Sequence, residues 1–280
     1  MRYNQLHLIL SSLVLTTCSI AGGKLGPGVP VLHLENEHVV QSSELHCHGN
    51  VRIFLDGAAE ESSARVLHKG VSVHSAKHDG KKSTFVKGRS AKNHEGYDVI
   101  FAGKNLLKDF TSIHMSDACT LEAVGLNMDA LKLLSNTTGS ITLRGTYKAG
   151  HIQQLKNNII DAYWIDSDFL EIDSQAGRML LAGTAKHVRA HTTGNAFLSL
   201  DSLRASNLWL AGYGNSFVRF FGDNIQLSSF MNDSARAESL GYPLLVNDQS
   251  RSHGVLVYHL PHFEPIQAAN ARVGKKPTVK

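Results

Sequence analysis

A pattern of alternating apolar residues, a polar turn and a second alternating run recurs through the middle of the chain. Its copies start at residues 113, 131, 152, 170, 188, 208 and 227, so the period is about 19 residues. Alternation with a period of two is typical of strands that bury one face. The Gly, Asn and Ser residues between the runs favour tight turns and exclude helices of useful length. The repeat therefore predicts an all-β protein built from similar short units.

Two architectures fit such a repeat: an antiparallel sandwich or barrel, and a parallel β-helix in which each period is one coil. Equivalent positions carry the same residue type in successive periods, as at Leu131, Leu170, Val188 and Leu208 and at Gly139, Gly177, Gly194 and Gly214. Stacked coils require such matching, whereas a sandwich does not. We therefore expect a single right-handed parallel β-helix (β-solenoid) over residues 41–260, with about eight coils at a spacing of about 4.8 Å.

Composition limits the class of protein further. The 280 residues are 42% hydrophobic and 19% charged, which excludes intrinsic disorder. The net charge of +4 comes from scattered basic residues and is too weak to indicate a nucleic-acid partner. Residues 56–110 fit the repeat poorly, so we expect a looped-out insertion over Lys77–Tyr97. Residues 261–280 are polar and basic, which predicts a flexible tail.

The first residues indicate export. Arg2 precedes an apolar run over residues 6–15, which has the length of a secretory signal and is too short to span a bilayer. The segment that ends at Cys18 resembles a bacterial lipobox, which implies a signal peptide over residues 1–17 and lipidation of Cys18. Ser19 resembles the outer-membrane sorting signal of Gram-negative lipoproteins, and residues 18–40 would form a tether. Ordinary secretion and a retained anchor are the alternatives.

Three segments carry a resemblance to a known family. These are Glu44–Leu55, Phe110–Leu121 and the repeat Leu131–Gly145, in which alternating strands are followed by turns rich in Ser and Gly. They resemble the family named "putative auto-transporter adhesin head GIN domain", and the likeness extends over residues 44–260. The resemblance implies right-handed β-helical coils in an exported, often lipid-anchored bacterial protein. No catalytic residues and no cofactor come with it.

Cysteine and histidine residues offer two further hypotheses. If Cys18 is lipidated, Cys47 and Cys119 remain, and they could form a disulfide or simply be two small buried side chains. His46 and His48 are two residues apart on an expected strand, so they would project together. With a third ligand they could hold a metal, although paired surface histidines are the simpler interpretation, and we expect no metal site.

The acidic residues of the chain concentrate in one segment. It holds Asp161, Asp166, Asp168, Glu171 and Asp173. Such a cluster could serve as the general acid and base of a carbohydrate-active enzyme, if the carboxylates converge, or it could be a solvated loop. The usual nucleophile and phosphate-binding motifs are absent from the sequence. The aromatic residues Tyr163, Trp209 and Phe221 could instead line a binding surface.

These features leave three hypotheses about function. The first is a non-catalytic cell-envelope lipoprotein, held to the outer membrane by its lipid and facing the periplasm or the surface. It would bind a protein or glycan through the side of the β-helix, in the manner of an adhesin. The second is a β-helical carbohydrate-active enzyme that uses the acidic cluster. The third is a structural module that stacks end to end through uncovered terminal coils.

Overall fold

The computed structural model describes residues 32–33, 42–78, 81–90 and 96–259. The expected signal peptide (1–17), Cys18 and the tail (261–280) lie outside the described residues. So does the expected tether (18–40), apart from the short strand β1 (Leu32–His33). The one helix within the described ranges is α1 (Lys104–Lys108), and no helix there is long and apolar enough to cross a membrane.

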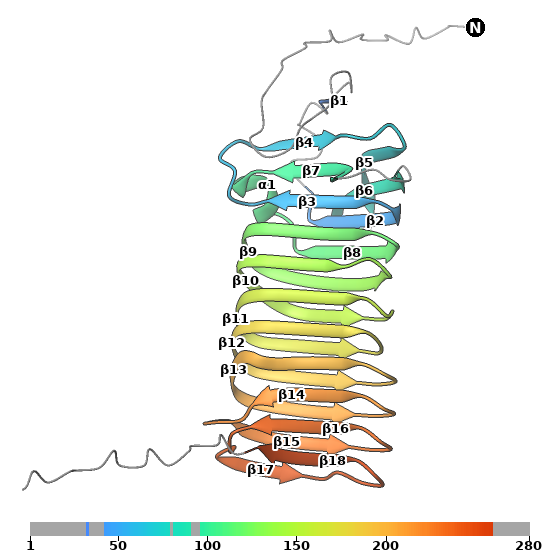
Figure 1. Ribbon diagram of the computed structural model, residues 1–280. Helices are drawn as coiled ribbons and strands as arrows, with labels where there is room; N and C mark the ends of the chain where they lie inside the picture. Colours follow the sequence, from blue (N-terminus) through green and yellow to red (C-terminus); the bar gives the residue numbers. More distant parts are fainter. Residues whose placement is uncertain (1–31, 34–41, 79–80, 91–95, 260–280) are drawn as a thin grey trace, which may run out of the picture. The chain divides into compact units, whose positions relative to one another are not determined.

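Residues 112–259 form a parallel β-solenoid of about eight turns (Figure 1), which confirms the predicted fold class. Each turn contributes two strand segments, which in the middle of the rod run on as one long, bent strand. The strands of this part are β8 (Ser112–Asp117), β9 (Thr120–Thr137), β10 (Ile141–Gln154), β11 (Ile159–Ser174), β12 (Arg178–Thr192), β13 (Phe197–Gly212), β14 (Phe217–Phe221), β15 (Gln226–Met231), β16 (Arg236–Leu240), β17 (Leu245–Asp248) and β18 (Val255–His259). They pair in parallel, each with the equivalent segment one turn away.

The apolar columns of the core follow the sequence repeat closely. Leu170, Val188, Leu208 and Leu227 pair in register and are almost fully buried, as the repeat predicts. Each aliphatic side chain covers its counterpart in the next coil, so the column excludes water along its whole length.

Two of the expected alignments are wrong. Leu131 lies beside Ala149 and not in the Leu170 column, because irregularities in the β9–β10 pairing shift the register near this corner. The glycines also divide into two sets: Gly194 lies against Gly214, whereas Gly177 lies against Asn158. The turns therefore differ in length from coil to coil although the strands stay in register.

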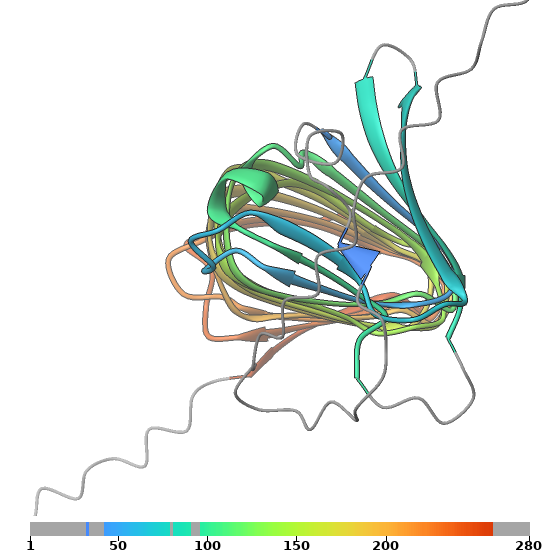
Figure 2. The ribbon, with the colours of Figure 1, turned by 90° about the horizontal axis from the view of Figure 1, so that it is seen from above.

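The coil is flattened, so the solenoid has two broad faces (Figure 2). We call one the Trp209 face: it is formed by β2 (Glu44–Asn50), β6 (Lys81–Arg89), β8, the second halves of β9 to β13, β15 and β17. The opposite face is formed by β3 (Arg52–Asp56), β7 (Val99–Ala102), the first halves of β9 to β13, β14, β16 and β18. The apolar core lies between the two faces.

Buried polar side chains line the core where the Trp209 face ends and the chain turns. Gln154 Nε2 donates a hydrogen bond to Asn158 Oδ1 at 2.8 Å, and Ser174 Oγ donates to Gln154 Oε1 at 2.8 Å. Asn158 Nδ2 donates to Ser135 Oγ at 2.9 Å and to the carbonyl oxygen of Gly139 at 3.1 Å. These side chains are buried, so their hydrogen-bond partners are one another and the backbone carbonyl groups beside them.

The N-terminal coils are not stacked in the order of the sequence. β2 (Glu44–Asn50) and β3 (Arg52–Asp56) lie between the later coil formed by β6 (Lys81–Arg89) and β7 (Val99–Ala102) on one side and β8 and β9 on the other. The expectation that successive coils stack in the order of the sequence is therefore wrong for the first coils. The chain adds one coil outside its starting point before it continues along the rod.

Most of the described part of the predicted insertion Lys77–Tyr97 is strand β6, which belongs to the sheet although it is also one arm of a projecting hairpin. β5 (Val71–His78) and β6 form an antiparallel hairpin, and β6 pairs in parallel with β2. β4 (Ser63–Val66) pairs antiparallel with β7 and, on its other side, with β1, so antiparallel strands cover this end of the rod. The hairpin extends beyond the outline of the coils in Figure 2.

A disulfide joins Cys47 in β2 to Cys119, which precedes β9, with the Cα atoms 6.2 Å apart. Both residues are fully buried. The bond therefore links the out-of-sequence N-terminal coils to the regular part of the solenoid.

Candidate functional site

Alternation along β11 decides which side chains the Trp209 face presents. Leu170 and Ile172 point into the core and are fully buried, so Phe169, Glu171 and Asp173 point outward. Because the coils stack in register, each of these outward positions begins a row that runs along the rod. One row passes from Glu171 through Arg189, Trp209 and Ser228 to Asn247, and another from Phe169 through His187 and Asn207 to Gln226.

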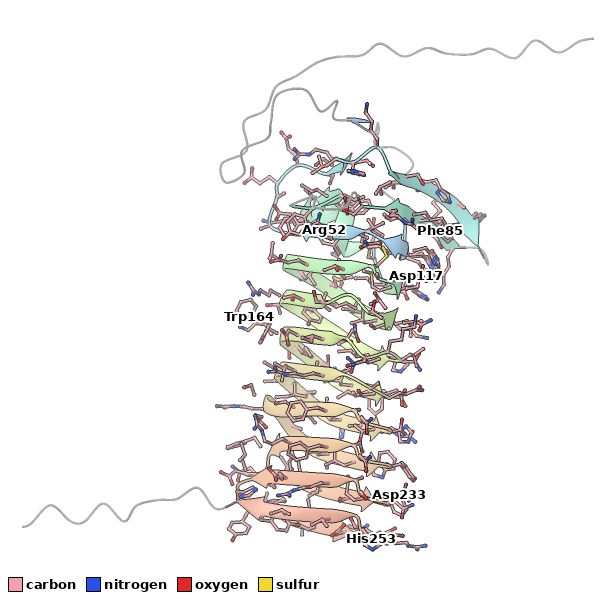
Figure 3. The ribbon with its side chains drawn as sticks, turned by 45° about the vertical axis from the view of Figure 1, so that its right-hand side comes forward. Arg52, Phe85, Asp117, Trp164, Asp233 and His253 are labelled. Carbon is pink, nitrogen blue, oxygen red and sulfur yellow. A yellow bond between two sulfur atoms is a disulfide. The ribbon has the colours of Figure 1, made fainter. Side chains whose placement is uncertain are left out.

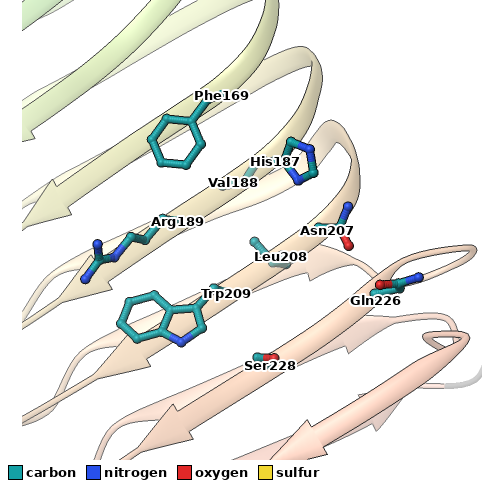
Figure 4. Close-up of a pocket in the computed structure, with 9 residues that line it drawn as sticks. All are labelled: Phe169, His187, Val188, Arg189, Asn207, Leu208, Trp209, Gln226 and Ser228. Atoms are coloured by element: carbon teal, nitrogen blue, oxygen red, sulfur yellow. The ribbon is translucent and has the colours of Figure 1, made fainter.

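Arg189 and Trp209 form the centre of this surface. The guanidinium carbon of Arg189 lies 4.8 Å from the centre of the Trp209 ring, and its Nη1 lies 3.8 Å from Oε1 of Glu171. A guanidinium over an indole is held by the negative charge density of the ring face. Phe169, Arg189 and Trp209 project from three successive strands in Figure 4. Trp209 is 38% exposed and Phe169 is 52% exposed, so both rings are accessible.

Two open hollows flank the stacked pair. The larger has a volume of about 520 Å³ and the smaller about 250 Å³. Arg189 and Trp209 line both hollows and therefore separate them. The larger is lined by Phe169, His187, Val188, Arg189, Asn207, Leu208, Trp209, Gln226 and Ser228. It combines aromatic carbon with amide, hydroxyl and imidazole groups.

Asp173 organises the smaller hollow. Its carboxylate accepts a hydrogen bond from Nε2 of His151 at 2.9 Å and lies 3.6 Å from Nδ1 of His191. His191 meets the edge of Tyr213, with ring centres 5.5 Å apart, and Tyr213 lies 5.7 Å from Phe230. These contacts fix the side chains on the side of Trp209 where the smaller hollow lies.

Trp164 stands apart from this surface, at the bent corner between the two faces. It is 62% exposed and has a φ of 64°, in the left-handed region that bulky residues rarely adopt. The neighbouring coils carry Gly145 and Gly183, also with positive φ, near this corner. Figure 3 shows Trp164 projecting from the edge of the rod opposite to Asp117 and Asp233.

The structure does not bring the predicted acidic cluster together. Asp161 lies on the opposite face, Asp166 and Asp168 lie at the corner, and Glu171 and Asp173 lie on the Trp209 face. The bend in β11 separates them because a flattened coil presents each part of one strand to a different side.

The corner carboxylates already have partners. Asp168 pairs with Nζ of Lys186 at 2.6 Å, and Thr184 Oγ1 donates a hydrogen bond to Asp166 at 3.1 Å. The hydrogen bond from Lys186 lowers the pKa of Asp168. Both groups of this ion pair are well exposed, so they form a solvated pair on the surface.

The three aromatic residues singled out from the sequence also divide. Trp209 lies on the face named after it, whereas Tyr163 and Phe221 belong to strand segments of the opposite face. Phe169 and Arg189, which complete the surface, were not identified from the sequence. The signal was present in the spacing of the repeats: Arg189 and Trp209 are the residues directly after Val188 and Leu208, which share a column.

His46 and His48 both point outward, but not toward a common centre. The His46 ring stacks on Phe85 with ring centres 4.8 Å apart and lies 4.4 Å from the ring centre of His114. His48 Nδ1 instead lies 2.8 Å from Oγ of Ser116. Within the described ranges, no group of three or more His, Cys, Asp or Glu side chains could hold a metal ion.

No family model matches the sequence, and no curated protein matches it. Solved structures do match. A "putative lipid binding protein" from Parabacteroides distasonis has a TM-score of 0.63 at 11% identity, over 82% of this chain and 96% of that one. A "putative adhesin" from Parabacteroides merdae has a TM-score of 0.58 at 15% identity, over 82% and 95%. Another "putative adhesin", from Bacteroides fragilis, has a TM-score of 0.52 at 13% identity, over 83% and 99%.

These matches place the chain among bacterial β-solenoids of the same architecture over nearly their whole length. At such low identity they show a shared fold. The fold implied by the family resemblance is thus supported, while membership of the GIN-domain family stays a prediction.

Proposed function

We propose that this protein is an exported, non-catalytic binding protein whose Trp209 face binds glycans. The observation that carries the proposal is the cluster of Phe169, Arg189 and Trp209, which come from three successive coils and two adjacent rows and line an open hollow of about 520 Å³. Two of the structural neighbours are named as putative adhesins, which is consistent with a binding function.

The chemistry of the hollow favours a sugar over a protein surface. A sugar ring has an apolar C–H side and a rim of hydroxyl groups that both donate and accept hydrogen bonds. Trp209 and Phe169 offer flat apolar surfaces, while Asn207, Gln226 and His187 supply donors and acceptors around them. A stable protein interface would require a larger apolar centre than two separated rings provide.

The positions of the carboxylates support a role without catalysis. Glycoside hydrolysis requires two carboxyl groups on either side of the scissile bond, about 5 to 9 Å apart. Glu171 faces Arg189, Asp173 is held by His151, and Asp161 lies on the other face of the coil. An enzyme built on this cluster would need these groups to leave their partners and converge.

We further propose that the protein is a lipoprotein, exported by residues 1–17 and anchored to the outer membrane through Cys18. The buried disulfide between Cys47 and Cys119 supports an oxidising compartment such as the periplasm or cell surface. Labelled palmitate should be incorporated by the wild-type chain and lost in Cys18→Ala. If the label persists in that variant, the anchor is elsewhere or absent.

A glycan array tests the binding function directly. The full chain carrying Cys18→Ala, which cannot be lipidated there, is compared with the same chain carrying Trp209→Ala or Trp164→Ala. The two tryptophans are the only ones in the sequence, and both are exposed, so the second variant is a matched control. We expect glycan signals that Trp209→Ala abolishes and Trp164→Ala retains. An array without signals, or signals that are insensitive to Trp209, would contradict the proposal.

A further inference from the structure

The largest concentration of exposed apolar residues lies at the C-terminal end of the rod and not on the Trp209 face. Six of the large hydrophobic side chains that are exposed in the described ranges come from its last strands and the corner between them. They are Leu240, Tyr242, Leu244, Leu245, Val246 and Val255. Leu244 is 68% exposed and Tyr242 is 54% exposed. Exposed apolar side chains gathered at one end of a protein indicate an interaction site.

The last inward-facing positions of the core columns lack a covering coil within the described ranges. Val246 pairs in register with Leu227, so it continues a buried column, yet it is 45% exposed. Leu256 and Tyr258 likewise continue the inward columns of Ala237 and Ser239, which are fully buried one coil earlier. No coil among the described residues therefore covers the core at this end.

The backbone is open in the same place. β17 pairs with β15 and β18 pairs with β16, and within the described ranges neither strand has a partner on its far side. Figure 1 shows the two strands as the last layer of the rod. Groups that face away from the rod can hydrogen-bond only to water or to another strand.

The other end of the rod is closed. β4 and β1 pair antiparallel beyond β7, and the β5–β6 hairpin covers the other side of that coil. Antiparallel strands interrupt the parallel stacking, so this end offers no continuation of the coil. The two ends of the solenoid are thus unlike each other.

We propose that the C-terminal end is the interface of a two-fold symmetric dimer, in which the last coil of one chain packs on the last coil of a second copy. An occupant of this end must cover the core columns and supply strands beside β17 and β18 at the same time. A second copy of the same end offers two strands at the matching separation, together with its own exposed Val246 and its partly buried Leu256. Strand addition of this kind is a recurrent mode of recognition.

The closed N-terminal end decides the form of the assembly. A head-to-tail contact would place the open coil of one copy on the antiparallel strands of the next and would generate a filament. A contact between two C-terminal ends uses one surface twice and closes after two chains. The structure therefore favours a closed dimer over the end-to-end stacking that the sequence left open.

The surface is tested by photo-crosslinking in the intact envelope. A photoreactive amino acid is placed at Leu244 of the full chain and, in a matched control variant, at the exposed residue Arg204 on the corner of the middle coils. We expect an adduct of twice the chain mass from Leu244 and none from Arg204. A ladder of larger species, an adduct with a different protein, or a link to residues 260–280 of the same chain would overturn the dimer.

A substitution tests the same interface in solution. Val246→Lys places a charge at the uncovered end of the core, where the side chain can still reach water, so the coil itself should fold. Sedimentation over a concentration series should show dimers for the Cys18→Ala chain and monomers for its Val246→Lys derivative, with unchanged circular dichroism. A monomeric parent chain would overturn the proposal. Glycan binding by single sites on the Trp209 face should persist in the monomer, so the two proposals can fail separately.

Discussion

The guanidinium of Arg189 lies over Trp209 with its carbon 4.8 Å from the ring centre, while Glu171 holds it from the other side. The three residues come from three successive coils and occupy one outward row, so the pairing register of the solenoid creates this contact. A tryptophan that is fixed in this way presents a rigid flat surface at a low cost in conformational entropy.

Replacing Arg189 by lysine should weaken glycan binding and leave the fold intact. Lysine keeps the positive charge but lacks the planar group that stacks on the indole. The loss of an exposed cation–π contact should lower the free energy of unfolding by no more than about 1 kcal/mol. We expect an affinity loss of about tenfold, or about 1.4 kcal/mol, by calorimetric titration. Arg204→Lys, at the corner, is the control, and equal affinities in all three proteins would refute this role of Arg189.

Removing the disulfide should destabilise the N-terminal coils strongly. Cys47 and Cys119 are 72 residues apart, so the bond restricts a long loop of the unfolded chain. The loop-entropy relation gives a loss of about 4 kcal/mol for the double variant Cys47→Ala/Cys119→Ala. Urea unfolding measures it, with Cys18→Ala as the control. An unfolding midpoint that does not respond to reducing agent would show that the bond is not formed.

Asn158→Ala should be among the costly polar substitutions. It removes the donor to the buried Ser135 hydroxyl, whereas the Gln154 amide loses only one acceptor and keeps the carbonyl oxygens of Asn158 and Arg178. Leaving the Ser135 hydroxyl without this hydrogen bond costs about 1 to 3 kcal/mol. The exposed Asn136→Ala should change the free energy of unfolding by less than about 0.5 kcal/mol. Similar values for the two variants would show that the buried network does not stabilise the coil.

The free energy of unfolding should decrease as the pH is lowered through the window set by His114. Burial, assisted by the neighbouring His46, lowers the pKa of His114 from 6.5 to about 4. Between these values the unfolded chain binds a proton that the folded chain does not, so the contribution of His114 is complete above pH 6.5 and declines as the pH falls toward about 4. Urea unfolding at several pH values should show this slope, and His114→Gln should reduce it. An NMR titration midpoint near 6.5 would contradict the assignment.

The regular part of the solenoid could be predicted because its information is local and repeated. Leu170, Val188, Leu208 and Leu227 recur at nearly constant spacing, and the register is continuous in the strand segments that hold them, so equal positions stack. Near Leu131 the register shifts at an irregularity, which side-chain alternation alone does not reveal.

No repeated sequence pattern of this kind indicates the order in which the N-terminal coils stack. β2 and β6 are both short alternating segments, and their sequences do not indicate which lies nearer to the regular coils. The disulfide from Cys47 to Cys119 joins β2 covalently to the regular coils. The separation of Asp161 from Asp173 could not be predicted from the sequence either, because it depends on where β11 bends and not on residue type.

The fluorescence emission of Trp209 gives the most direct test of glycan binding at the Trp209 face. Trp164→Phe leaves Trp209 as the only tryptophan of the chain, so its emission reports on the proposed site alone. Titration with the glycan that gives the strongest array signal should shift this emission saturably, with the affinity that calorimetry gives for the parent chain. Binding that leaves the emission of Trp209 unchanged would place the glycan elsewhere and contradict the proposal that the Trp209 face binds it.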